Sequence, residues 1–182
     1  RLARELQPSV LLRNRGIGAY GDFYTPDRQI PPGFQEGSPW QAIHPGAQAF
    51  SYLPNDNYKP AEWIVHTLVD VVAKGGNLEI GYGPMPNGTW PRPVIERLRD
   101  VGKWMKVNGE AIYATRPYST FREGDDVRFT RSKDGATLYL ITLKWPGREL
   151  RSRLANVSSG DEITLLGVPA KLNWRLDGDT AV

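Results

Sequence analysis

The stretch LVDVVAKGGNLEIGYGPMPNGTWPRPVIERLRDVGKWMKVNGEAIYATRP, residues 68–117, decides the fold class of this chain. A helix opened by Pro60 runs into it with apolar residues at helical spacing and ends at the glycine pair Gly75 and Gly76. Residues 77–82, which follow this glycine pair, predict a strand. A second amphipathic helix follows, marked by Val94, Leu98, Val101 and Met105 and ended by Asn108 and Gly109. Alternating helices and strands predict a parallel α/β unit.

Upstream of this stretch, residues 7–13 (QPSVLLR) predict a short buried strand of the same sheet, because an apolar run between turn residues is typical of parallel strands. Residues 14–59 are rich in Gly, Pro and aromatic residues and predict a long irregular loop. Loops of that length inside a compact domain are uncommon and are usually functional. We therefore expect the functional residues of the α/β unit in this loop.

Downstream, the pattern changes to short alternating runs, which predict a separate all-β unit. We expect α/β residues 1–117 followed by all-β residues 118–182, with strands at 127–130, 137–144, 162–166 and 172–176. The Asp134-Gly135 pair between the first two runs predicts a hairpin. A further turn at Asp177-Gly178 lies close to Val182, so we expect a closing strand beyond Val182.

The composition excludes several classes of function. Lys and Arg outnumber Asp and Glu by only 23 to 20 and are scattered, so we expect no nucleic-acid partner. Cysteine is absent, which excludes disulfides and thiolate metal sites. No apolar run approaches the ~20 residues that span a bilayer, so we expect no membrane span. No His, Asp and Glu cluster has metal-ligand spacing, so we expect no catalytic metal and no cofactor.

Residues 68–117 closely resemble family 29 of the glycoside hydrolases, the α-L-fucosidases, in the KGGN strand entry, the GP loop and the W…NGEAIY helix end. Upstream, GDFYTPD at residues 21–27 resembles the family's D-F-x-T-x-E segment. The PWQ and FSY segments at 39–41 and 50–52 resemble its W-E…F-G-Y segment. The resemblance is good over residues 6–118 and looser beyond them.

The resemblance implies the C-terminal part of a (β/α) TIM-like barrel, with its active site at the carboxyl ends of the strands, followed by a C-terminal antiparallel β-sandwich. It also implies an exo-acting hydrolase that releases terminal α-L-fucose from glycans by a retaining double displacement. The family's nucleophile is an Asp in a segment upstream of Arg1, and the chain starts without methionine. We therefore expect the isolated chain to be inactive without the N-terminal half of the barrel.

A retaining glycosidase also needs an acid/base carboxyl group about 5 Å from its nucleophile. Two family positions serve this role, and in this chain they fall on Asp27 and Gln41. Asp27 is the candidate acid/base, with an Asx-type turn as the alternative. Gln41 can hydrogen-bond a sugar but cannot donate a proton usefully. Glu36 in the same loop could serve instead, although a solvated loop carboxylate is the more ordinary role.

Four further residues are expected to bind substrate. By resemblance, Arg15 matches an arginine that contacts fucose near the ring oxygen, and Phe50 matches an aromatic residue that packs on the apolar side of the sugar. Trp40 supports Phe50, with core packing as the alternative. His44 lies between them and could contact a leaving sugar, although most lone loop histidines have no such role. Glu79 is expected to face the barrel interior and pair with an arginine.

Other interpretations stay open. Asp27 and Gln41 stand where the family has Glu, which favours a carbohydrate-binding homologue whose catalysis has decayed. The chain could also be one subunit of a split enzyme. A glycosidase for a fucose-like sugar such as L-galactose is a third alternative. Expected partners are fucosylated glycans and the N-terminal half of the barrel, and homo-oligomerisation is left open. The resemblance implies a secreted, periplasmic or lysosomal protein.

Overall fold

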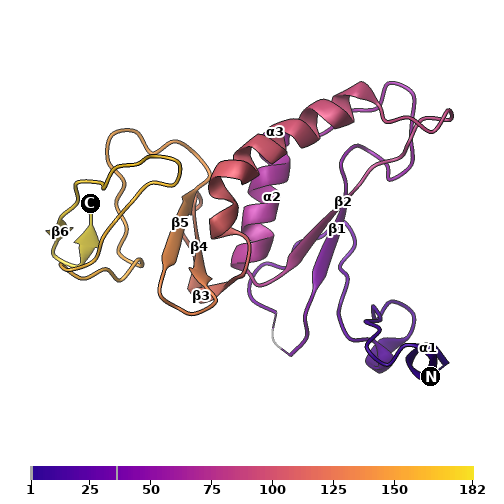
Figure 1. Ribbon diagram of the computed structural model, residues 1–182, viewed down its shortest axis with the longest axis horizontal. Helices are drawn as coiled ribbons and strands as arrows, with labels where there is room; N and C mark the ends of the chain where they lie inside the picture. Colours follow the sequence, from indigo (N-terminus) through magenta and orange to yellow (C-terminus); the bar gives the residue numbers. More distant parts are fainter. Residues whose placement is uncertain (1, 36) are drawn as a thin grey trace.

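The computed structural model describes residues 2–35 and 37–182 and is a mixed α/β fold followed by antiparallel β structure. Figure 1 shows two helices side by side in the middle, with two parallel strands on one side and an antiparallel sheet on the other. In chain order the elements are α1 Leu2–Leu6, η1 Gly18–Tyr20, β1 Gln41–Pro45, α2 Ala61–Ala73, β2 Asn77–Gly81, α3 Arg92–Asn108, η2 Gly109–Ala111, β3 Thr115–Glu123, β4 Val127–Ser132, β5 Leu138–Thr142, β6 Leu176–Asp177 and β7 Thr180–Ala181.

The two predicted helices and the strand between them are confirmed. Pro60 is the residue before the first turn of α2, and the helix stops where Gly75 adopts a positive φ of 84°. That left-handed conformation suits glycine, which lacks a Cβ. A proline in the first turn likewise opens α3. The helical spacing of apolar residues therefore predicted both helices to within a few residues.

The parallel strands are β1 and β2, in register from Gln41 opposite Asn77 to Pro45 opposite Gly81. Two shorter extended segments continue this parallel arrangement through single bridges between Arg13 and Phe23, Tyr24 and Trp40, and Asp27 and Ile43. The chain therefore lays four extended segments next to one another in sequence order. In a parallel arrangement their carboxyl ends meet at one edge.

Two predictions for the N-terminal region are wrong. Residues 7–13 do not form a strand: only Arg13 forms a bridge and Leu11 is 75% exposed. The backbone of Gln7 and Val10 forms local turn hydrogen bonds instead of pairing with a neighbouring strand. Residues 14–59 are not irregular throughout, since β1 lies within them. Four of its five residues are buried, so β1 is a buried strand too short to produce a clear sequence pattern.

The antiparallel part consists of the sheet β3-β4-β5, whose second hairpin turns at Asp134-Gly135 as predicted. Phe129 on β4 is fully buried, and Val127 and Ala155 complete the core beneath the sheet. The prediction of strands at 162–166 and 172–176 is wrong. Only the Thr164–Lys171 bridge and the small β6–β7 hairpin form there. A positive φ of 81° at Gly167 interrupts the segment between the two runs.

Helix α2 contributes to two apolar clusters. Val71 packs with Trp40 and Ala42 of the parallel part. Val65 and Val69 pack with Ile112, and residues of α3 and of the end of β5 cover that second cluster. The outer members of the second cluster are Leu68, Val72, Val101, Trp104, Met105, Ile141 and Leu143. The helix therefore connects the α/β part to the antiparallel sheet through packed side chains.

Candidate functional site

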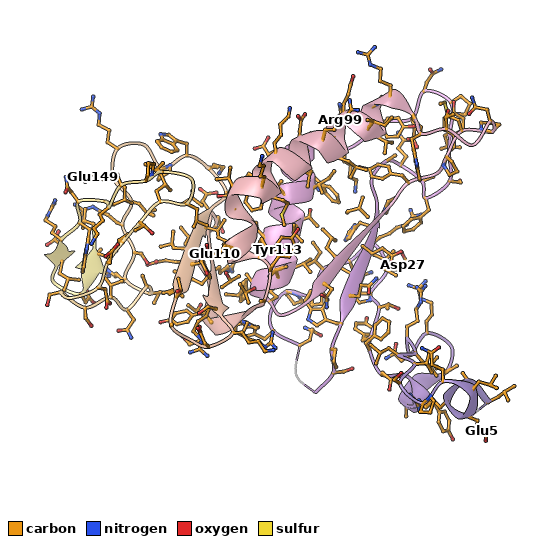
Figure 2. The ribbon with its side chains drawn as sticks, in the orientation of Figure 1. Glu5, Asp27, Arg99, Glu110, Tyr113 and Glu149 are labelled. Carbon is orange, nitrogen blue, oxygen red and sulfur yellow. The ribbon has the colours of Figure 1, made fainter. Side chains whose placement is uncertain are left out.

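Arg15 and Asp27 lie together at the carboxyl ends of the first two extended segments. Arg15 follows the paired residue Arg13, and Asp27 is the last paired residue of its own segment, next to β1 (Figure 2). Arg15 Nη1 lies 3.5 Å from Asp27 Oδ2, and Arg15 Nη2 donates to the backbone oxygen of Thr25 at 3.3 Å. Their side chains are 48% and 45% exposed, so both can reach a ligand.

The backbone holds Asp27 from both sides. Ile43 N donates to Pro26 O at 3.1 Å, and Arg28 N donates to Ile43 O at 2.8 Å. Among the residues that the structure describes, only Arg15 donates a hydrogen bond to the Asp27 carboxylate. The turn-forming alternative for Asp27 requires a local backbone donor to that carboxylate, and the described residues supply none. The carboxylate is therefore available for chemistry.

Phe50 lies at the same edge, against the end of β2. A Cβ added to Gly81 would come within 2.6 Å of Phe50 Cδ1, so the ring occupies the space that a side chain at position 81 would fill. The Arg28 guanidinium lies over the Phe50 ring, with its carbon 5.2 Å from the ring centroid. Arg15, Asp27 and Phe50 thus come from three different segments to one edge of the parallel strands.

Gln41 does not lie at the edge that carries Arg15, Asp27 and Phe50. It is the first residue of β1, at the opposite end of the strand from this edge, and its Nε2 donates to the Glu79 carboxylate. The prediction that Glu79 pairs with an arginine is wrong. Within the described ranges Glu79 forms no ion pair, and its carboxylate accepts a hydrogen bond from the Gln41 amide. The pair joins β1 to β2 through side chains on the same face.

Trp40 and His44 are buried against α2. Trp40 is 2% exposed and packs on Ala42 and Val71, which favours the core-packing alternative. His44 is 7% exposed, and its ring meets the Trp63 ring of α2 edge to face at 5.7 Å. Burial, together with the charge of the nearby Lys59, holds the pKa of His44 below its ordinary value, so the imidazole is neutral at neutral pH.

Sequence reasoning missed two cations near this edge. Arg28 directly follows Asp27, and Lys59 places its ammonium 3.7 Å from the centroid of the Trp63 ring. The available signals were the position of Arg28 beside the candidate acid/base and that of Lys59 at the end of the loop. Neither signal is specific, because most exposed Arg and Lys side chains are simply solvated. Glu36, the other candidate carboxylate, lies outside the described residues.

Other features of the described part bear on function. A hollow of about 600 Å³ between the end of β2 and the start of α3 is lined by Tyr82, Trp90 and Leu98, among others, but by none of the predicted site residues. No three His, Cys, Asp or Glu side chains of the described ranges converge as a metal site would require. None of the described helices has the length and apolarity to cross a membrane.

Comparison with known proteins identifies the family. The family model described as alpha-L-fucosidase matches residues 1–110. Human plasma alpha-L-fucosidase is 33% identical over 166 residues, which cover 87% of this chain and 36% of that protein. Bovine tissue alpha-L-fucosidase is 36% identical over 115 residues, covering 63% and 24% respectively. This chain therefore spans about a third of the length of the plasma relative.

Solved structures agree over nearly the whole chain. The alpha-fucosidase of Thermotoga maritima is 30% identical, with a TM-score of 0.82 over 99% of this chain and 42% of the other. The same protein in complex with fucose gives a TM-score of 0.81 at 29% identity. Because the family model covers more than half of the residues and these structures share the fold, the chain belongs to the α-L-fucosidase family.

Proposed function

We propose that the protein is a retaining, exo-acting α-L-fucosidase in which Asp27 is the acid/base and Arg15 binds the sugar. The observation that carries this proposal is the approach of Arg15 to Asp27 at the carboxyl edge of parallel segments. A carboxyl group there can protonate the leaving oxygen and then take a proton from the attacking water. A guanidinium beside it offers a fixed set of donors to sugar oxygens.

The rest of the site follows from the family. The nucleophilic carboxylate would come from barrel strands outside these residues, in keeping with the greater length of the relatives. Residues 1–117 would form the rear of a (β/α) barrel and residues 118–182 a β-sandwich. The parallel register of β1 and β2 and the match to the Thermotoga maritima fold support this arrangement. Phe50 would pack on the apolar side of the fucose ring.

Partners and location are proposed on the same basis. The Thermotoga maritima relative has been solved with fucose, which supports fucosylated glycans as ligands. Relatives named as plasma and tissue proteins support a secreted or lysosomal location. The N-terminal half of the barrel would complete the catalytic site in the full-length protein. We propose no role in catalysis for Gln41, Trp40 or His44, which lie at the amino end of β1 or against α2.

The test uses the full-length protein, an aryl α-L-fucoside with a good leaving group, and azide. Asp27→Ala should slow turnover by about 10²- to 10⁴-fold, the usual contribution of general acid–base catalysis. Azide should restore turnover and give α-fucosyl azide. The α configuration follows because azide attacks the glycosyl-enzyme, so the two inversions cancel. A β-fucosyl azide would instead identify Asp27 as the nucleophile, and unchanged turnover in Asp27→Ala would exclude it from catalysis.

A sugar-binding protein without catalysis is the second candidate. It is favoured by Gln41, which occupies one of the family's two acid/base positions and hydrogen-bonds Glu79. In that case the full-length protein would bind fucose without hydrolysing aryl fucosides. Calorimetric titration with fucose beside the activity assay separates the two functions.

A further inference from the structure

Arg28 is placed beside Asp27 by an unusual backbone conformation. Its φ of 56° lies in the left-handed region, which residues other than glycine seldom adopt. The hydrogen bond from Arg28 N to Ile43 O fixes this turn directly after the carboxyl end of the Asp27 segment. The guanidinium then lies over the Phe50 ring, in the region where the fucose site is proposed.

Lys59 approaches the same region from the other end of the loop after β1. Its backbone N donates to Gly46 O at 2.9 Å, so the residue lies next to the carboxyl end of β1. Its ammonium lies 3.7 Å from the centroid of the Trp63 ring, and that ring contacts His44. Aromatic faces therefore hold both cations in place.

Neither cation has a carboxylate partner within the residues that the structure describes, whereas Arg15 nearby is paired with Asp27. Burial lowers the pKa of Lys59, and the charge of Arg28 lowers it further, so the two cations are close enough to repel each other. Buried His44 experiences the charges of Lys59, Asp27 and Arg28 together, which places all four groups in one region. Within the described part of the chain, Arg28 and Lys59 therefore carry positive charges that no ion pair offsets.

An anion is the ligand that this arrangement suits. A guanidinium held over an aromatic ring still has N–H groups with which to bind two oxygens of a carboxylate or sulfate. An ammonium nearby adds a point charge, and a bound anion would relieve the repulsion between the cations. Since the acid/base acts on the leaving oxygen, the leaving group lies next to Asp27, where the cations that follow Asp27 and β1 can reach it.

We propose that Arg28 and Lys59 form a subsite for an anionic leaving group, so that fucosides whose aglycone carries a carboxylate or a sulfate ester are preferred substrates. This inference rests on the proposed fucosidase function. It predicts that the preference falls as salt rises, because screening weakens contacts between partly exposed charges.

The test compares three aryl α-L-fucosides whose rings carry hydroxymethyl, carboxymethyl or sulfatomethyl at the same position, with the full-length protein. The methylene keeps the substituent's charge from altering the leaving oxygen strongly. We expect kcat/KM for at least one anionic substrate to exceed that for the neutral one by about tenfold, the factor that 1.4 kcal/mol represents. The two anionic arms show whether the carboxylate or the sulfate is the better ligand.

The readout in the variants is the ratio of kcat/KM for the anionic substrate to that for the neutral one, in which general losses of activity cancel. The ratio should fall towards one in Arg28→Gln and in Lys59→Gln, and should be intermediate in Arg28→Lys, which keeps charge without the bidentate geometry. Arg148→Gln is the matched control, because Arg148 is exposed in the C-terminal part and forms no ion pair within the described ranges. Its ratio should equal that of the wild type.

A wild-type ratio near one, or a ratio that both Gln variants leave unchanged, would overturn the subsite. If no fucoside is hydrolysed, the proposed function fails, and the subsite is then tested by binding alone. Calorimetric titration with galactose 6-sulfate and with galacturonate should show binding by the wild type that Arg28→Gln weakens at least severalfold. Equal binding by the two proteins, or no binding by either, would reject the subsite independently of catalysis.

Discussion

Arg128 on β4 donates from its Nε to Asp70 Oδ1 on α2 at 2.6 Å, and Lys74 Nζ lies 2.6 Å from the other carboxylate oxygen. These side chains are at most 17% exposed, so the carboxylate neutralises two cations in a largely buried place. Removing one member of a buried pair leaves an uncompensated charge. Asp70 is thus the main polar connection between the helix and the antiparallel sheet.

We expect Asp70→Ala to lower the free energy of unfolding of the full-length protein by about 3 kcal/mol or more, measured by urea denaturation. Asp100→Ala is the control, because Asp100 pairs with Lys103 on an exposed face of α3. Exposed pairs contribute little to stability. Equal losses in the two variants would show that the Asp70 ion pairs are not buried in solution.

Gly81 should be sensitive to the addition of a single methyl group. A Cβ at this position would lie 2.6 Å from Phe50 Cδ1. Gly81→Ala should therefore displace the ring and raise KM for aryl fucosides. Gly102→Ala adds the same group to α3, where nothing lies within 4 Å, and should stabilise the helix by about 0.5–1 kcal/mol without affecting KM. An unchanged KM in Gly81→Ala would separate Phe50 from the sugar site.

Replacing Trp40 should mainly reduce stability, whereas replacing Phe50 should mainly weaken substrate binding. Trp40→Ala removes a side chain that is 2% exposed and should destabilise the protein by about 3–5 kcal/mol. Phe50→Ala removes a half-buried ring and should raise KM with a smaller change in Tm. Thermal unfolding and steady-state kinetics on both variants check this. A Trp40→Ala protein of normal Tm and high KM would restore the binding role for Trp40.

His44 should make stability depend on pH in the acid range. Burial lowers its pKa in the folded protein below the ordinary value of 6.5, so the unfolded chain takes up the proton more readily. Stability should therefore fall as the pH drops below about 6.5. His44→Phe, which keeps a ring against Trp63, should lose less stability between pH 7.5 and 5.5. Parallel Tm curves for the two proteins over that range would contradict this.

The sequence predicted elements with long, regular patterns and missed short buried ones. Helix α2 was predictable because apolar residues recur over 13 residues between a proline and a glycine. Strand β1 has only five residues, and four are buried, with Ala42 and His44 packed against Val71 and Trp63 of α2. Such burial depends on tertiary contacts and removes the alternation that marks a half-exposed strand. The loop prediction for residues 14–59 failed for this reason.

The candidate site was predictable to the extent that local motifs carried it. Asp27 and Arg15 were chosen from short segments that resemble a family, and the structure brings them to 3.5 Å. His44 and Trp40 were chosen from the same region, but the direction of a side chain on β1 depends on strand register, which the sequence did not reveal. Arg28 became noticeable only from its backbone conformation and its position over Phe50.

The double role of α2 limits how this protein can be divided or recombined. Val71 belongs to one apolar cluster while Val65 and Val69 belong to another, so a single helix supplies both interiors. A chimaera that takes its antiparallel region from a relative would have to match the foreign side chains to the outer face of α2. Joining two sequences near residue 117 would separate Val65 and Val69 from Ile141 and Leu143. A crossover before Pro60 would instead separate Trp40 and Ala42 from Val71, so neither junction keeps both interiors intact.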